Sequence, residues 1–302
     1  MVFVVSFIIA SFLAPVFYGA GMIIESQLSV RTFKHPTTMI FYISLMNAVF
    51  LPLVLFLGTP TIPSPWEFSF YVVLAAIDIV YLYPFYLSLK VIDTSIVEAL
   101  YSLGAITIPV MTWFLLDERL LLEQYIGFFI IVMASVALSV KGRKIPKLSK
   151  AFYYVLFSSF LRALYLVLEK YVLSNDVNWI NVTIYPNLIS GFMPFSFFLV
   201  AKWRKDIVRN FPPYLHKFKF FAINEFLCFL GLVCTVYALS GVSAVVNAAI
   251  VAMQPIFMLA MSYFLLKRFG IPLNEKISLQ ILEKKLFCFV LIILGVILVT
   301  VE

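Results

Sequence analysis

Long apolar runs separated by short polar segments make up almost the whole chain. Each run has about 16 to 24 residues, enough for an α-helix to cross a hydrocarbon core of about 30 Å. Polar and apolar positions do not alternate with a period of two, so the runs predict helices rather than the strands of a barrel. We predict ten transmembrane helices, at residues 3–24, 38–57, 68–89, 95–115, 124–140, 151–173, 181–201, 220–239, 243–266 and 286–301.

One stretch of the chain occurs twice. An offset of 150 residues superimposes Leu89 on Leu239 and brings the pair Asp117-Glu118 onto the pair Lys267-Arg268. Each half contains an odd number of predicted helices, so the second half has to enter the membrane from the opposite face. The opposite charges at the ends of the two copies agree with this inversion, because basic loops favour the cytoplasmic side.

The predicted fold class is an all-α membrane protein with ten transmembrane helices arranged as two inverted five-helix repeats. We place the repeats at residues 1–145 and 146–302, which together form one transport domain. The loops after the odd-numbered helices hold 19 of the 22 Lys and Arg residues. By the positive-inside rule these loops are cytoplasmic, and both chain termini are outside.

Composition supports the membrane assignment and excludes several classes of function. Hydrophobic residues make up 63% of the chain and charged residues 12%, which is more apolar surface than one soluble core can bury. The three cysteines lie in apolar runs, and the sequence has no metal-ligand spacing and no phosphate-binding glycine loop. We expect no metal, no cofactor, no enzymatic activity and no nucleic-acid partner, since the net charge of +7 follows from the loops.

The duplicated stretch has a recurring layout. In each copy a helix that ends in Leu is followed by a short turn, a Ser, an apolar helix with an internal proline, and a Leu-rich end, after which another apolar helix begins. This layout resembles the ten-helix EamA branch of the drug/metabolite transporter superfamily. The resemblance extends over nearly the whole chain and is closest at residues 88–137 and 238–298.

Three positions depart from the family pattern. Pro109 stands 20 residues after Leu89, which is about one helical turn later than the 16 residues that separate Pro255 from Leu239 in the second copy. In addition, Arg268 replaces the expected Glu, and Asn47 stands roughly where the second helix often carries Arg.

The resemblance implies an alternating-access carrier in a prokaryotic cytoplasmic membrane. It also implies a substrate cavity between the halves, lined mainly by helices 1, 3, 4, 6, 8 and 9. Because the sequence has no ATP-binding motif, we expect secondary transport, with protons as a candidate coupling ion. The expected partners are a small-molecule substrate and the lipid bilayer, and the protein is expected to be a monomer or a homodimer.

Two ionisable residues, Asp78 and Arg162, lie in the middle of predicted helices. Such a side chain costs about 2.5 to 3.5 kcal/mol at membrane depth on insertion scales, so it should face a cavity or a partner. Two interpretations are open. Arg162 holds a substrate carboxylate or phosphate while Asp78 binds an ammonium, or the two side chains pair with each other and hold the halves together.

Acidic residues nearer the helix ends are further candidates for binding or proton coupling. Glu225 has apolar neighbours, which favours a cavity role. Glu98 lies one turn into its predicted helix, where it is either a coupling residue or an acidic residue favoured by the helix dipole. Asp78 is the third coupling candidate. Glu169 and Lys170 are expected at the outer membrane interface, paired locally or reaching toward water.

Uncharged residues complete the predicted site. Tyr81 is one helical turn from Asp78, and its ring suits a cation site. Asn247 and Gln254 are seven residues apart on one predicted helix and hence on one face, where they bind substrate or join helices. Pro109 and Pro255 fall in equivalent helices, and we predict that they act as hinges, with static kinks as the alternative. Pro255 belongs to the predicted helix 243–266.

Together these residues favour a secondary transporter of a small polar metabolite, with an amino acid or a related zwitterion as the first choice. An organic cation or drug exporter is the alternative within transport. A non-transporting membrane scaffold derived from a carrier is the alternative from another class.

Overall fold

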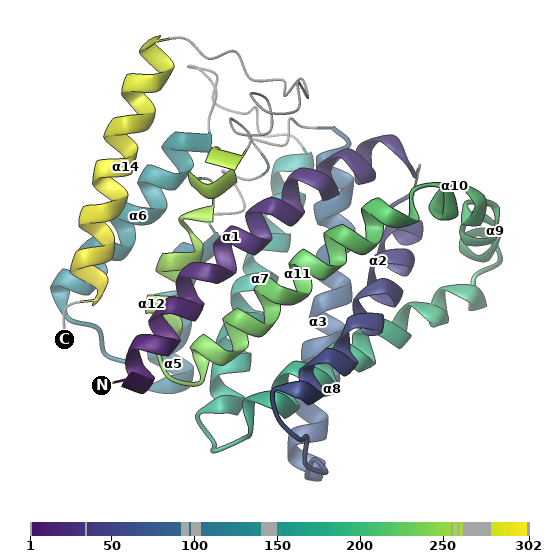
Figure 1. The fold of residues 1–302 in the computed structure, drawn as a ribbon, viewed down its shortest axis with the longest axis horizontal. Helices are drawn as coiled ribbons and strands as arrows, with labels where there is room; N and C mark the ends of the chain where they lie inside the picture. The colour runs from purple at the N-terminus through teal and green to yellow at the C-terminus, as the bar shows by residue number, and fades with distance from the viewer. Residues whose placement is uncertain are drawn as a thin grey trace.

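The computed structural model describes residues 2–33, 35–91, 97, 104–139, 150–254, 256–258, 260–261 and 279–300. That part of the chain is helical and contains no strand (Figure 1). The first half holds α1 (Val2–Arg31), α2 (Pro36–Phe50), η1 (Leu51–Phe56), α3 (Pro65–Leu89), η2 (Ala105–Thr107), α5 (Ile108–Leu116) and α6 (Leu122–Ser139). The second half holds α7 (Lys150–Leu173), α8 (Trp179–Phe192), η3 (Met193–Leu199), α9 (Ala201–Arg209), α10 (Phe211–His216), α11 (Phe218–Leu239), α12 (Ala244–Val251) and α14 (Leu279–Thr300).

Six of the described helical segments are long and apolar enough to cross a membrane, by length and composition. Four shorter apolar helices accompany them in the described part of the chain. The total of ten stays a prediction, because the expected helices 95–115 and 243–266 fall partly outside the described residues. The six long segments are Val5–Glu25, Pro36–Phe56, Pro65–Leu89, Lys150–Leu173, Trp179–Leu199 and Phe218–Leu239.

Side-chain caps start three of the helices. The side chain of Ser64 accepts a hydrogen bond from the backbone of Glu67 at the start of α3, and Ser243 does the same for Val246 at the start of α12. Asn178 caps α8 in the same way. Each cap satisfies an amide that has no partner inside the helix, so these polar residues fix where an apolar run begins.

Two predicted helices change their winding before they end. The runs 38–57 and 181–201 were expected to be continuous α-helices, but α2 gives way to the 3-10 helix η1 and α8 gives way to η3. Pro52 and Pro194 each lie at the second position of the 3-10 segment. Proline lacks the amide that an α-helix needs there, which accounts for the change in both places.

Helices from the two halves pack against each other throughout the molecule. The main pairs are α1 with α11, α3 with α7, α2 with α8, and α6 with α14, and Figure 1 shows α1 beside α11 and α6 beside α14. Glycines allow the last pair to approach closely. A Cβ atom added to Gly127 would lie 2.6 Å from the carbonyl oxygen of Gly295, so only glycine fits at this crossing.

The connections between helices gather at two opposite ends of the bundle. At one end the segment after α2 meets the start of α8, where the amide of Thr61 donates to Asn181 Oδ1 at 2.8 Å. At the other end Tyr42 donates to the carbonyl oxygen of Ile207 at 2.7 Å, and Lys217 Nζ donates to Thr32 Oγ1 at 3.1 Å. Helices α9 and α10 therefore pack at the end opposite to Thr61.

Candidate functional site

A cavity of about 270 Å³ lies between the two halves of the chain. It is lined from α1, α3, α5, α7, α11 and α12, the helices that correspond to those expected, and also from α2 and α8. Its lining is mostly apolar, and its charged members are Glu25, Asp78, Arg162 and Glu225. A mostly apolar cavity with a few convergent polar groups is the usual form of a small-ligand site.

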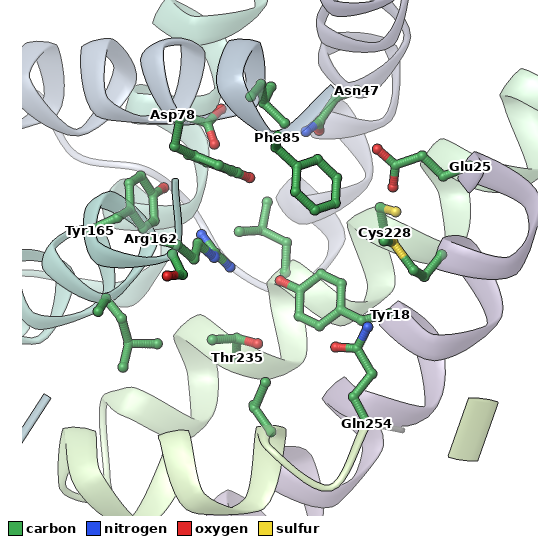
Figure 2. Close-up of a pocket in the computed structure, with 18 of the residues that line it drawn as sticks. Tyr18, Glu25, Asn47, Asp78, Phe85, Arg162, Tyr165, Cys228, Thr235 and Gln254 are labelled. Carbon is green, nitrogen blue, oxygen red and sulfur yellow. The ribbon is translucent and has the colours of Figure 1, made fainter. Parts of the chain in front are cut away.

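Asp78 and Arg162 lie on the same side of this cavity (Figure 2). The guanidinium carbon of Arg162 is 5.0 Å from the ring centroid of Tyr165 and 5.9 Å from that of Tyr81, which is within range of cation–π attraction. Asp78 comes from the neighbouring helix α3, and its carboxyl lies close to the hydroxyl groups of Tyr81 and Ser190. Ring faces and hydroxyl groups therefore orient both charged groups.

Asp78 and Arg162 interact electrostatically in the lining of the cavity. Among the described residues the ion pairs within 4.0 Å are His35 with Asp206, at 3.5 Å, and Arg119 with Asp117, at 3.4 Å. The charged atoms of Asp78 and Arg162 are therefore more than 4.0 Å apart.

Glu25 and Glu225 lie elsewhere in the lining, on α1 and α11. Tyr86 donates its hydroxyl proton to Glu25 Oε1, and Asn224 Nδ2 donates to Glu225 Oε1 at 2.8 Å. Figure 2 places Glu25 across the cavity from Asp78, with the ring of Phe85 between them and the ring of Tyr18 nearer to Gln254. The cavity therefore has two polar regions separated by an aromatic side chain.

The other predicted site residues have separate outcomes. Tyr81 and Gln254 line the cavity together with Asp78, Arg162 and Glu225. Asn247 does not line it: its side chain is fully buried elsewhere, and neither amide atom has a hydrogen-bond partner in the described structure.

The prediction that Asn247 and Gln254 share one face was wrong. It assumed a continuous helix, whereas α12 ends at Val251 and the chain turns at Ala252–Met253 before Gln254. The amide of Met253 bonds three residues back, to Ile250, at 3.0 Å, which breaks the α-helical register.

The structure does not test the roles predicted for the two prolines and for Glu98. Glu98 and Pro255 lie outside the described residues. Pro109 was expected inside a continuous helix, but it occupies the second position of α5, directly after the 3-10 segment η2. Proline is favoured in a first helical turn because it has no amide to satisfy there. The hinge roles of Pro109 and Pro255 stay predictions.

Glu169 occupies a different place from the one predicted. It was expected at the outer interface, but its side chain is 1% exposed and its Oε1 atom has no hydrogen-bond partner in the described structure. It interacts electrostatically with Arg162. The spacing contained the signal, because Arg162, Tyr165 and Glu169 are separated by three and four residues and so share a helix face.

Tyr18 is a cavity residue for which the sequence gave no signal of its own. Its ring lies against Gly231 of α11, where an added Cβ atom would be 2.8 Å from the ring. The phenol reaches the cavity only because this position of α11 has no side chain. The pairing of an aromatic residue with a distant glycine depends on tertiary contact, which periodicity within one helix does not reveal.

At the end of the bundle near Ser243, groups from both halves meet. Lys170 Nζ donates to the carbonyl oxygen of Leu239 at 2.8 Å. Burial raises the pKa of Glu118 above its usual range, while the backbone of Ala244 and the charge of Lys170 oppose this shift. These contacts join α7 and the segment after α5 to the ends of α11 and α12.

Membrane-length apolar helices around a cavity with charged groups define a class: integral, multi-pass membrane proteins with an internal cavity. Residues 5–140 match the sequence profile of the EamA-like transporter family. This family is part of the drug/metabolite transporter superfamily, and the match confirms the predicted resemblance over that part of the chain.

A solved structure extends the likeness to nearly the whole chain. It carries the description "Crystal structure of protein" and is 13% identical in sequence, with a TM-score of 0.60 over 97% of this chain and 95% of its own. At this identity the likeness concerns the fold alone. No curated protein sequence matches the chain.

Proposed function

We propose that the protein is a secondary transporter that moves an amino acid or a related zwitterion across a prokaryotic cytoplasmic membrane by alternating access. The match of residues 5–140 to a transporter family supports transport in general. The observation that carries the choice of substrate is the position of Arg162 and Asp78 on one side of a single cavity between the halves. A guanidinium and a carboxylate at membrane depth complement the two charges of a zwitterion.

The architecture under this proposal is a pair of inverted repeats, residues 1–145 and 146–302, with ten helices and both termini outside. Reciprocal packing supports it. The first helix of the first repeat, α1, packs on α11, and the first helix of the second repeat, α7, packs on α3. A second support is local: α2 and α8 end in Phe50-Leu51-Pro52 and Phe192-Met193-Pro194, each leading into a 3-10 segment.

In the proposed binding mode, Arg162 holds the substrate carboxylate through two parallel N–H donors. The rings of Tyr81 and Tyr165 lie near its guanidinium and limit the orientations it can adopt. Asp78 holds the substrate ammonium, assisted by the hydroxyl of Tyr81. A bound zwitterion then bridges α3 and α7 and neutralises the charge of each.

Alternating access would follow from rocking of the two repeats around this site. Pro109 and Pro255 are the proposed bending points, since they occupy the fourth predicted helix of each repeat. Asp78, Glu225 and Glu98 are the proposed residues for coupling to protons. Lys170 and Glu118 would then close one end of the cavity through their contacts at Leu239 and Ala244.

Two other functions make different predictions. An organic cation exporter is favoured by the excess of acid in the lining, where three carboxyl groups face one guanidinium. A non-transporting scaffold derived from a carrier has no use for charged groups at membrane depth, and four such groups line this cavity. That cost favours transport over the scaffold.

The test is thermal stabilisation of the purified protein by amino acids, amines, nucleosides and organic phosphates. A ligand that binds the folded state raises the melting temperature once its concentration exceeds the dissociation constant. We expect an amino acid to stabilise the wild type, and Arg162→Ala or Asp78→Asn to weaken its binding at least about thirtyfold. Arg119→Ala and Asp176→Asn remove an exposed charge of the same kind and should leave binding unchanged.

Other outcomes would change the proposed function or substrate class. A purely cationic ligand lost only in Asp78→Asn supports the organic cation exporter. Ligands that bind both folded variants as well as the wild type remove Asp78 and Arg162 from the site. If no compound stabilises the wild type, the scaffold gains support.

A further inference from the structure

A second polar region of the cavity, besides that of Asp78 and Arg162, is built around two carboxyl groups. Glu25 comes from α1 and Glu225 from α11, and these helices pack along each other. Glu225 is only 5% exposed. Glu225 interacts electrostatically with Glu25 first and with Asp78 to a smaller extent.

Hydrogen-bond acceptors outnumber donors in this region. Each carboxyl group has one described donor, Tyr86 for Glu25 and Asn224 for Glu225. Asn224 is fully buried, and its Oδ1 atom has no hydrogen-bond partner. Asn47 also lines the cavity and has a buried Oδ1 atom without a partner.

Positive charge is missing as well. Among the described residues no Lys or Arg forms an ion pair with Glu25 or Glu225. Two carboxylates close together in a low-dielectric cavity repel each other and are costly to bury without compensation. An ammonium group supplies what this region lacks, since it has three donors, no acceptor and one positive charge.

The spacing of Asp78 and the Glu25 partner along α3 restricts the molecule that brings this ammonium. Asp78 and Tyr86, the partner of Glu25, are eight residues apart on α3, so their backbone positions are about 12 Å apart along the helix axis. The α-ammonium and α-carboxylate of an amino acid are attached to the same carbon, so one such head group cannot occupy both regions. A second cationic group at the end of the substrate's own side chain can reach from one polar region to the other.

We propose that the substrate is a basic amino acid, with its α-carboxylate at Arg162, its α-ammonium at Asp78 and its side-chain ammonium between Glu25 and Glu225. This inference rests on the proposed function, because it names the substrate class of the same cavity. The ring of Phe85, which lies between the two regions in Figure 2, contacts the methylene chain. Both polar regions and the apolar middle of the cavity are then matched by one molecule.

The experiment compares L-lysine with L-norleucine, which has the same carbon chain but ends in a methyl group. We expect the wild-type protein to bind lysine at least about tenfold more tightly, as measured by calorimetry on the purified protein. Glu25→Gln and Glu225→Gln should each reduce this preference to about threefold or less while norleucine affinity stays at its wild-type value. Norleucine binding also shows that each variant is folded. Glu123→Gln, an exposed glutamate at the start of α6, should keep the full preference.

Each other result counts against a different part of the inference. Equal affinity of the wild type for lysine and norleucine overturns the second ammonium subsite and leaves the zwitterion site standing. Failure of the folded wild type to bind any amino acid overturns the proposed function and this inference together. Tight binding of cadaverine, the diamine without a carboxylate, that survives Arg162→Ala overturns the basic amino acid in favour of a diamine.

Discussion

The helix pair α3 and α7 and the pair α1 and α11 occupy reciprocal places in the proposed repeat, yet they carry different chemistry. Ser159-Phe160-Leu161-Arg162 on α7 has its counterpart in Ser11-Phe12-Leu13-Ala14 on α1, so Arg162 corresponds to the fully buried Ala14. At the offset of 150 residues, Asp78 corresponds to Cys228 and Tyr81 to Gly231. The carboxyl groups of the second pair, Glu25 and Glu225, lie at other positions.

Under the proposed repeat, this difference teaches that a duplicated scaffold leaves its charged groups free to diverge. Packing positions would recur because both halves bury the same kind of helix surface. Charged positions would not recur, because the proposed substrate has no internal symmetry and needs a different group at each end. Exchanging side chains between the corresponding positions tests whether their environments differ.

Introducing the charge of α7 into α1 should have the largest effect. Ala14→Arg places a guanidinium in a packed position with no cavity to receive it, and we expect a loss of about 2.5 to 3.5 kcal/mol in stability. Yield and melting temperature in detergent measure this. Ala14→Met, which adds a side chain of comparable length without the charge, is the matched control for the added volume. A stable Ala14→Arg variant would show that α1 and α7 have interchangeable environments, contrary to the comparison.

Filling the glycine of α11 should have a smaller effect. Gly231→Ala places a Cβ atom against the ring of Tyr18, and we expect about 1 to 3 kcal/mol of destabilisation and weaker ligand binding. Melting temperature and affinity are the readouts. Combining Gly231→Ala with Tyr18→Ala should remove most of the added strain, because the Tyr18 ring is the group with which the new Cβ atom clashes. If the double variant is as strained as the sum of the singles, the contact is not the cause.

Removing the charge of Glu118 should have the smallest effect, visible only as a pH dependence. Burial raises the pKa of Glu118 in the folded protein, so its neutral form is favoured there. The stability linked to this group is fully present below the unfolded pKa of about 4.3 and is lost as pH rises through the higher folded pKa. Glu118→Gln should therefore gain in melting temperature over the wild type between pH 5 and pH 8. Glu123→Gln, which removes an exposed carboxyl, should show no such gain.

The sequence predicted the membrane-length segments and the charged part of the cavity for a common physical reason. Water is absent at membrane depth, so apolar length marks a helix, and an ionisable group in its middle marks a protected interior position. Asp78 and Arg162 were found in this way and Glu225 from its apolar neighbours, and all three line the cavity.

Features that depend on breaks in a helix or on contacts between helices were not predictable in the same way. Asn247 and Gln254 were predicted to share a helix face, but the turn at Ala252–Met253 interrupts the helix between them. Glu169 was assigned to the interface from its distance along the helix, although its direction placed it inside. Periodicity gives the direction of a side chain only as long as the helix is continuous and its orientation in the bundle is known.

The contact between Gly127 and Gly295 joins α6 of the first half to α14 of the second half. During synthesis α6 is complete long before α14 exists, and its glycine surface lacks this partner until α14 leaves the ribosome. A chain interrupted before residue 279 would insert α6 without that contact. The pairs α1 with α11, α3 with α7 and α2 with α8 can therefore form before α6 and α14 close together.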